Sequence, residues 1–179
     1  MPKLIENAKE LILETSKKLL FEVGYEGFKI REVASRCGIA TGTIFNYFAS
    51  KEMLIASIIA KDWINYLDDI KRECDLASDI ASGVTGIYKG IEAFSKKYES
   101  IWMGYSGDII GRFGKHHLTL RGQIADILSK MLLHFEKKLD KSVVNILAET
   151  VLASAVQKDI GLTDLLRFTA MLIPNIEDK

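Results

Sequence analysis

The stretch Ile30–Met53, IREVASRCGIATGTIFNYFASKEM, contains two short segments with helical character, separated by a glycine. Gly38 follows the first segment, and a glycine just past a helix end adopts the left-handed conformation without steric cost. Ile44 and Phe48 are four residues apart in the second segment, so they share a face that can anchor this helix to a core. After the turn, Ile39 is expected to pack inward. The stretch therefore predicts a helix-turn-helix.

The outward face of the second helix has an unusual composition for a surface exposed only to solvent. It holds small, polar and aromatic side chains, and no acidic residue occurs before Glu52. Thr41 or Thr43 is expected to cap this helix through its hydroxyl. Threonine and asparagine can hydrogen-bond to base edges or phosphates, and aromatic rings can touch thymine methyl groups. The residues expected to meet bases or the groove are Arg31, Thr41, Gly42, Thr43, Phe45 and Asn46, and those expected to hold phosphates are Lys29, Tyr47 and Lys51.

The charge around this face is positive, although the whole chain is neutral. Twenty-four basic residues balance 24 acidic ones over the 179 residues. From Lys29 to Lys51 there are four basic residues and one acid, which gives 4 − 1 = +3. A local basic patch fits a surface that faces phosphates, whereas the neutral chain predicts only modest affinity for arbitrary nucleic acid.

The same stretch resembles the DNA-binding domain of the tetracycline-repressor (TetR) family of bacterial regulators. The resemblance lies in FEVGY at 21–25, Gly38-Ile39, and GTIFNYFASKEML at 42–54, and it covers about the first third of the chain. The chain departs from the family pattern at Lys29-Ile30, where threonine is frequent, and at Ala49, where proline is common. The resemblance implies an all-α protein with an N-terminal homeodomain-like three-helix domain, followed by a helical domain for ligand binding and dimerisation.

Helical periodicity continues along the rest of the chain. Gly83, Gly86 and Gly90 flank one apolar stripe, where close helix approach is expected more than room for a ligand. The expected domains are 1–51, which binds DNA, and 52–179, which senses a ligand and dimerises. The expected helices are 6–23, ended by Gly24 and Gly27; a connecting helix from 51 towards 71; 77–101; 120–135; 142–157, capped by Asp140 or Ser142 and ended by Gly161; and 162–173, with 105–115 a loop or broken helix.

The last two helices are apolar over more than one face, so they are expected to be buried on two sides. A second copy of the chain can supply the second surface, and the resemblance implies pairing through these helices; the alternative is that they only form the monomer core. The expected interface residues are Val143, Leu147, Val151, Ala155, Leu162, Leu166, Phe168, Thr169 and Leu172.

TetR-like proteins sense a small molecule inside the helical body, which implies an effector pocket here. Its aromatic character suits a hydrophobic or aromatic ligand, although such residues at helical spacing are more often plain core. The candidate lining residues are Trp63, Tyr66, Phe94, Tyr98, Trp102, Met103, Tyr105 and Phe113.

Several other classes of protein have little support. No run of 18 apolar residues predicts a membrane helix, and the first residues lack the apolar segment of a signal peptide, so a cytoplasmic location is expected. Cys37 and Cys74 have no metal or disulfide spacing, and the adjacent His116 and His117 do not share a helix face. No catalytic motif, metal site or cofactor is expected.

The favoured function is a ligand-responsive regulator, expected to be a repressor. It would bind a palindromic operator in double-stranded DNA as a homodimer, without contact to a membrane. One alternative is a helical protein or enzyme that binds a small molecule and uses its helix-turn-helix only for packing. Another is a helical scaffold for protein partners.

Overall fold

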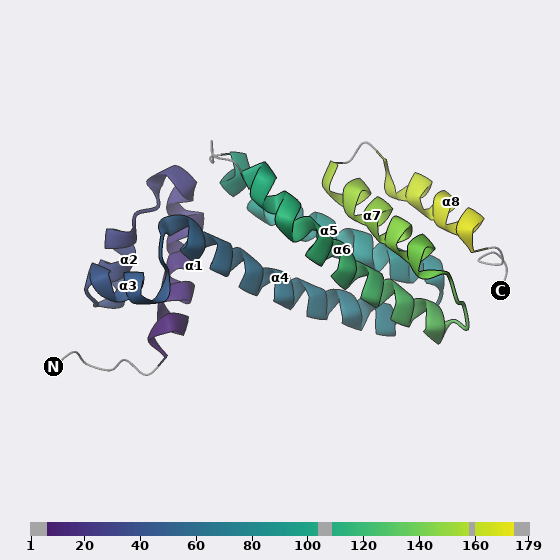
Figure 1. Cartoon of the computed structure of the whole chain (residues 1–179), viewed down its shortest axis with the longest axis horizontal. Coiled ribbons are helices and arrows are strands. Elements are labelled where there is room, and N and C mark those ends of the chain that lie inside the picture. Colours follow the sequence, from purple (N-terminus) through teal and green to yellow (C-terminus); the bar gives the residue numbers. More distant parts are fainter. Residues whose placement is uncertain (1–6, 104–108, 158–159, 174–179) are drawn as a thin grey trace. The chain divides into compact units, whose positions relative to one another are not determined.

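The computed structural model of the chain describes residues 7–103, 109–157 and 160–173, with side chains throughout except at 102, 103 and 109–116. The described residues form helices and no strand (Figure 1), which confirms the all-α prediction. The helices are α1 (Ala8–Gly27), α2 (Ile30–Cys37), α3 (Thr41–Tyr47), α4 (Lys51–Asp75), α5 (Ile80–Met103), α6 (Ile109–His134), α7 (Lys141–Gln157) and α8 (Leu162–Leu172).

The chain divides into two compact units. One comprises Met1–Ile64 and Tyr98–Gly107, and the other Asn65–Lys97 and Asp108–Lys179. Helices α4 and α5 therefore each contribute to both units. The functional division into domains 1–51 and 52–179 concerns DNA binding and ligand sensing, and it stays a prediction.

In the first unit, a left-handed glycine forms the turn between α2 and α3. Gly38 has φ 66° and ψ 32°. Its N–H donates to the carbonyl of Ser35 at 3.1 Å, and the N–H of Ile39 donates to the carbonyl of Ala34 at 3.0 Å. This pair of bonds is a Schellman motif, which satisfies carbonyls left open at the helix end. The predicted role of Gly38 is confirmed, and Ile39 is half-buried.

The predicted end of α1 is confirmed, whereas the predicted cap of α3 is not. Gly24 has φ 68° and ψ −178° and interrupts α1, which ends at Gly27, so both predicted breaks occur. The predicted hydroxyl cap of α3 is wrong. Helix α3 begins at Thr41 with no side-chain cap, and the N–H of Thr43 instead donates to the carbonyl of Ala40 at 2.9 Å. The backbone turn before α3 therefore satisfies this donor without a hydroxyl.

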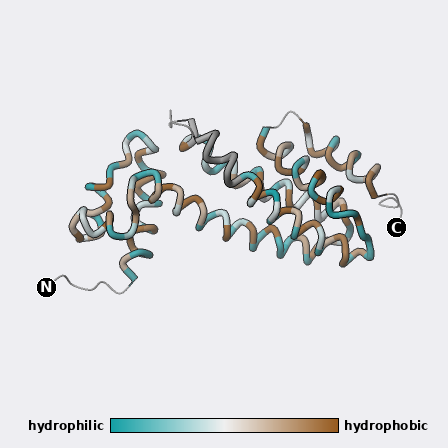
Figure 2. The backbone as a smooth tube through the Cα atoms, in the orientation of Figure 1, coloured by the Kyte–Doolittle hydropathy of each residue, from teal (hydrophilic) through white to brown (hydrophobic). Residues whose placement is uncertain are grey.

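In the second unit, glycines allow α5 to pack closely against its neighbours. A Cβ atom added at Gly90 would lie well inside contact distance of Ile70 on α4, and one at Gly83 would collide with Met131 on α6. These contacts confirm the expected close approach. Along α4, hydrophobic and hydrophilic residues alternate as in an amphipathic helix (Figure 2).

Three further predictions on the helices have definite outcomes. The prediction of a loop or broken helix at 105–115 is wrong from Ile109 onward, because α6 begins there and includes Gly111 and Gly114; residues 104–108 lie outside the described part. Asp140 does cap α7, since its Oδ1 accepts the N–H of Ser142 at 2.8 Å. Gly161 does not end α7 but precedes α8, since α7 stops at Gln157.

Over the described residues, no helix has the length and apolarity needed to cross a membrane.

Replacing Gly90 by alanine is expected to destabilise the protein by about 1–3 kcal/mol, because the added methyl group must displace the buried Ile70. Gly122→Ala is the matched control. An added Cβ at this glycine of α6 meets nothing within 4 Å, so the gain in helix propensity makes the change neutral or stabilising. Urea unfolding of both variants checks this. Equal midpoints would contradict the close approach.

Candidate nucleic-acid interface

Helix α3 has one buried face and one exposed face, as the sequence predicts. Ile44 and Phe48 are buried in the core of the first unit. Phe45 and Tyr47 are 49% and 46% exposed, an unusual state for two large aromatic side chains on a short helix. Of the other predicted contact residues on α3, Gly42 and Asn46 are exposed and Thr41 and Thr43 are half-buried. The predicted contact residues thus occupy the part of α3 that Ile44 and Phe48 do not bury, and four of them are exposed.

The basic patch is weaker than the sequence count suggests. Lys29 and Arg31, at the start of α2, are exposed. Arg36 is instead held by two carboxylates: Nη1 lies 2.6 Å from Oε2 of Glu22, and Nε lies 3.1 Å from Oε1 of Glu32. These hydrogen bonds, first that of Glu22, raise the pKa of Arg36. Glu22 lies on α1, outside the range 29–51, and so does not enter the net charge of +3; the positive surface rests mainly on the other basic side chains.

Lys51 has a structural contact that the sequence reading did not include. Its Nζ donates to the backbone carbonyl of Tyr25 at 2.6 Å and lies 4.1 Å from the centroid of the Tyr25 ring. The Tyr25 hydroxyl in turn donates to Oε1 of Glu52 at 3.4 Å. The hydrogen bond from Ser50, more than that from Tyr25, lowers the pKa of Glu52. Lys51 therefore links the end of α1 to the start of α4, and its predicted contact with a DNA phosphate stays a prediction.

Two short helices, a left-handed glycine turn and an exposed polar and aromatic face on the second helix define a helix-turn-helix protein. Residues 12–58 match the model of a family described as "Bacterial regulatory proteins, tetR family". Over these residues the chain is similar to TetR-family transcriptional regulators.

Curated relatives support the same family and show where the likeness lies. The chain is 36% identical over 55 residues to the HTH-type transcriptional repressor KstR of Rhodococcus jostii, covering 31% of this chain and 26% of the relative. It is 27% identical over 97 residues to the HTH-type transcriptional repressor AcnR of Corynebacterium glutamicum, covering 54% of this chain and 46% of the relative. The chain thus spans less than half the length of these curated relatives.

Solved structures extend the fold likeness beyond the helix-turn-helix. A TetR-family transcriptional regulator from Streptomyces coelicolor superposes with a TM-score of 0.58 at 18% identity, over 94% of this chain and 98% of that one. The regulator FadR of Bacillus subtilis, in complex with stearoyl-CoA, gives a TM-score of 0.54 at 15% identity, over 94% and 97%. At these identities the likeness establishes the fold.

The predicted dimer interface on α7 and α8 needs correction. Leu147, Val151, Ala155 and Thr169 are buried within the single chain, so their side chains have no surface left for a partner. The periodicity was ambiguous because α7 is apolar nearly all round, and burial against the rest of the second unit takes these four. Of the other predicted residues, Val143, Leu162, Leu166, Phe168 and Leu172 are half-buried. Ile146 and Met171, which are 57% and 80% exposed, are not among the residues predicted for the interface.

Four side chains of the predicted pocket are described, and their role in ligand binding stays a prediction. Trp63 and Tyr98 are buried in the first unit, whereas Tyr66 and Phe94 make an edge-to-face contact in the second, with centroids 5.4 Å apart. The side chains of Trp102, Met103, Tyr105 and Phe113 lie outside the described residues. A pocket of about 350 Å³ in the second unit is lined by other residues: Leu67, Lys71, Cys74, Asp75, Gln123, Asp126, Ile127, Lys130 and Met131.

Two titratable side chains of the second unit, Cys74 and His117, make contacts within the chain. Burial raises the pKa of the Cys74 thiol to about 12, so the thiol stays protonated and unreactive at neutral pH. Its Sγ donates to the carbonyl of Gly83 at 3.8 Å. Nε2 of His117 lies 2.8 Å from both carboxylate oxygens of Glu149. In the described part of the chain, no three His, Cys, Asp or Glu residues group so as to hold a metal ion.

Replacing Lys51 by methionine is expected to lower the stability of the protein by about 1–2 kcal/mol, because the carbonyl of Tyr25 loses a charged donor and its ring loses a cation. Lys29→Met is the control, since Lys29 is an exposed member of the same predicted phosphate-binding set. Thermal unfolding checks both variants. A Lys51 variant as stable as the Lys29 variant would contradict the stabilising role of the contacts between Lys51 and Tyr25.

Proposed function

We propose that the protein binds an operator in double-stranded DNA as a homodimer and that α3 is the recognition helix, which lies in the major groove. The observation that carries the proposal is the exposed face of α3. About half of the surface of Phe45 and of Tyr47 is exposed there, while Ile44 and Phe48 are buried and anchor the same helix. Arg31, Thr41, Gly42, Thr43, Phe45 and Asn46 would meet bases or the groove, and Lys29, Tyr47 and Lys51 would hold phosphates. Such a regulator acts in the cytoplasm, where bacterial operators lie.

We propose that two copies pair through α7 and α8 and that the operator is a pseudo-palindrome with half-sites about one helical turn apart, or a multiple of it. The exposed apolar side chains of Ile146 and Met171 support the pairing, since such side chains are costly to leave in water. The half-buried Leu166 lies on the same helix as Met171 and would complete the contact. KstR and AcnR are named repressors, which supports repression as the mode of action.

We propose a small hydrophobic molecule as the effector that releases the DNA. FadR of Bacillus subtilis, which shares the fold, holds stearoyl-CoA, a molecule with a long apolar chain. The 350 Å³ pocket between α4 and α6 falls within the size range of small-molecule sites. Its lining combines Leu67, Ile127 and Met131 with lysines and aspartates, so it suits an apolar molecule with a polar end.

Two substitutions in the proposed DNA interface are expected to affect DNA binding in different ways. Lys29→Ala should weaken binding to every sequence and reduce the slope of log K against log[salt] by roughly 0.9, because one phosphate contact is lost. Asn46→Ala should leave the slope unchanged and relax the preference at one base pair of each half-site by about 1–3 kcal/mol. Fluorescence anisotropy at several salt concentrations measures both effects. Lys18→Ala, an exposed lysine of α1, is the control and should bind as wild type.

Replacing Met171 by glutamate is expected to dissociate the homodimer, because a charge would be buried in the proposed interface. Sedimentation velocity should then show a monomer. Leu133→Glu is the matched control, because Leu133 is also an exposed apolar side chain but lies on α6. A Met171→Glu protein that remains a dimer would place the interface elsewhere.

Selection of genomic DNA fragments by the purified wild-type protein tests the whole proposal. We expect enrichment of a palindromic site that the Tyr47→Ala/Lys51→Ala double variant does not retain. Because Lys51 also stabilises the fold, a Tyr47→Ala single variant must show the same loss. The absence of any enriched site with a folded wild-type dimer would contradict DNA recognition by α3.

A further inference from the structure

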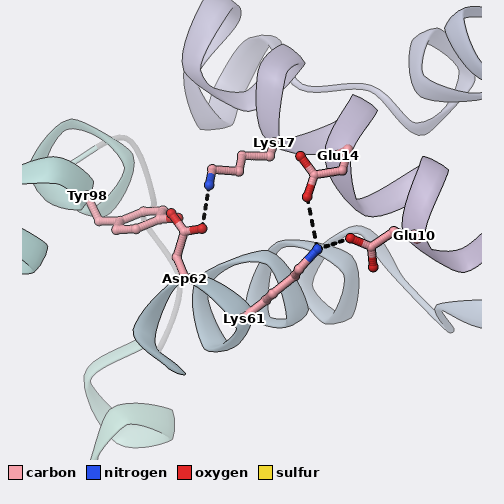
Figure 3. Close-up of polar contacts among 6 residues, drawn as sticks. All are labelled: Glu10, Glu14, Lys17, Lys61, Asp62 and Tyr98. Atoms are coloured by element: carbon pink, nitrogen blue, oxygen red, sulfur yellow. Dashed lines mark hydrogen bonds and ion pairs between the residues drawn. The ribbon is translucent and has the colours of Figure 1, made fainter. Parts of the chain in front are cut away.

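A buried polar junction joins three helices inside the first compact unit (Figure 3). Asp62 of α4 divides its two carboxylate oxygens between two partners: Oδ1 accepts from the ammonium group of Lys17 on α1, and Oδ2 accepts the hydroxyl of Tyr98 on α5 at 2.8 Å. Asp62 is only 3% exposed, and Tyr98 is completely buried. A carboxylate this deeply buried depends on its partners, because an unpaired buried charge is strongly destabilising.

Helix α1 contacts the same tyrosine a second time. Phe21 lies one turn beyond Lys17 on α1, and its ring centroid is 5.4 Å from that of Tyr98, with the two planes tilted by 54°. Tyr98 is therefore bonded at its hydroxyl to α4 and packed at its ring against α1. A displacement of Tyr98 must disturb both contacts together.

An exposed set of ion pairs beside the junction provides an internal comparison. Lys61, next to Asp62, pairs with Glu14 at 2.9 Å and with Glu10 (Figure 3). The hydrogen bond from Lys61 lowers the pKa of Glu14. These side chains are 36–55% exposed, and exposed ion pairs contribute little to stability because water screens them. Both sets join α1 to α4, but only the Asp62 set includes α5.

The position of Tyr98 in the chain gives this junction its importance. Helix α5 contributes to the second unit up to Lys97 and to the first unit from Tyr98 onward. Helix α1 in turn supplies the buried side chains, among them Leu19 and Leu20, that share the core with Ile44 of α3. The junction is thus the place where α5 meets the helix that supports the helix-turn-helix.

We propose that Asp62 and Tyr98 are positioning residues for DNA binding. The Lys17–Asp62–Tyr98 junction fixes α1, and with it α3, in the orientation that fits the operator, and makes this orientation depend on where α5 holds Tyr98. A movement of α5 is passed to α1 through the Asp62 carboxylate as well as through the contact between the Tyr98 and Phe21 rings. The inference rests on the proposed DNA-binding function.

The test is Tyr98→Phe, which removes one hydroxyl and keeps the ring against Phe21. Operator affinity is measured well below the unfolding temperature, so that the folded fraction is the same in all proteins. We expect a roughly tenfold loss of affinity, the effect of one hydrogen bond to a charged group. The salt slope should be unchanged, because no phosphate contact is removed. Asp62→Asn should act in the same direction and be non-additive with Tyr98→Phe.

Lys61→Ala is the matched control, because it removes exposed ion pairs between the same two helices. It should change operator affinity by less than about twofold. Wild-type affinity in Tyr98→Phe, with or without a lower unfolding temperature, would overturn the proposal and leave the junction a purely structural role. An equal loss in Lys61→Ala would also overturn it, because any contact between α1 and α4 would then suffice.

Hydrogen exchange separates this inference from the proposed function. Amides of α1 and α2 are expected to exchange faster in Tyr98→Phe than in Lys61→Ala, with no DNA present. Unchanged exchange would overturn the positioning role even if the wild-type protein binds an operator. Faster exchange in a protein whose wild-type form binds no operator would instead refute the DNA-binding function and leave the mechanical link standing.

Discussion

The burial of one face of α3 is the constraint on which the helix-turn-helix depends. A helix of seven residues has too few internal hydrogen bonds to be stable by itself in water. Its structure therefore comes from the packing of Ile44 and Phe48 into the core that α1 and α2 provide. This arrangement leaves Gly42, Phe45, Asn46 and Tyr47 of α3 exposed. The same short helix thus has one face that fixes it to the core and another that is exposed.

The charged side chains of the first unit serve mainly to join helices. Arg36 links α2 to α1 through Glu22, Lys51 links α4 to the end of α1, and Lys17 links α1 to the buried Asp62. Two of the four basic side chains over 29–51, Arg36 and Lys51, have a carboxylate or carbonyl partner within the chain. The surface left for an anionic polymer is correspondingly small, which favours recognition by shape and by direct contacts over general electrostatic attraction.

Local signals in the sequence predicted the helix-turn-helix closely, because its determinants are local. A glycine after a short helix and two apolar residues four apart predicted two short helices joined by a turn at Gly38, which is where α2 and α3 lie. The partners of Arg36 and Asp62 could not be predicted, since they come from helices that meet only in three dimensions. Four residues predicted for a dimer face are buried within the chain, because α7 is apolar nearly all round and its periodicity does not tell which side the chain itself covers. The start of α6 was missed because glycine has low helix propensity, and Gly111 and Gly114 lie within this part of the helix.

The unequal environments of the two cysteines have a practical consequence for spectroscopy. Cys74 is buried with a thiol that stays protonated, whereas Cys37 is partly accessible at the end of α2. A maleimide dye or a nitroxide reagent should therefore attach selectively to Cys37 in the unmodified chain. The label would sit beside the glycine turn of the helix-turn-helix, and in a two-fold assembly the same position would be marked twice. Distance measurements between paired labels then become accessible without introducing a new thiol.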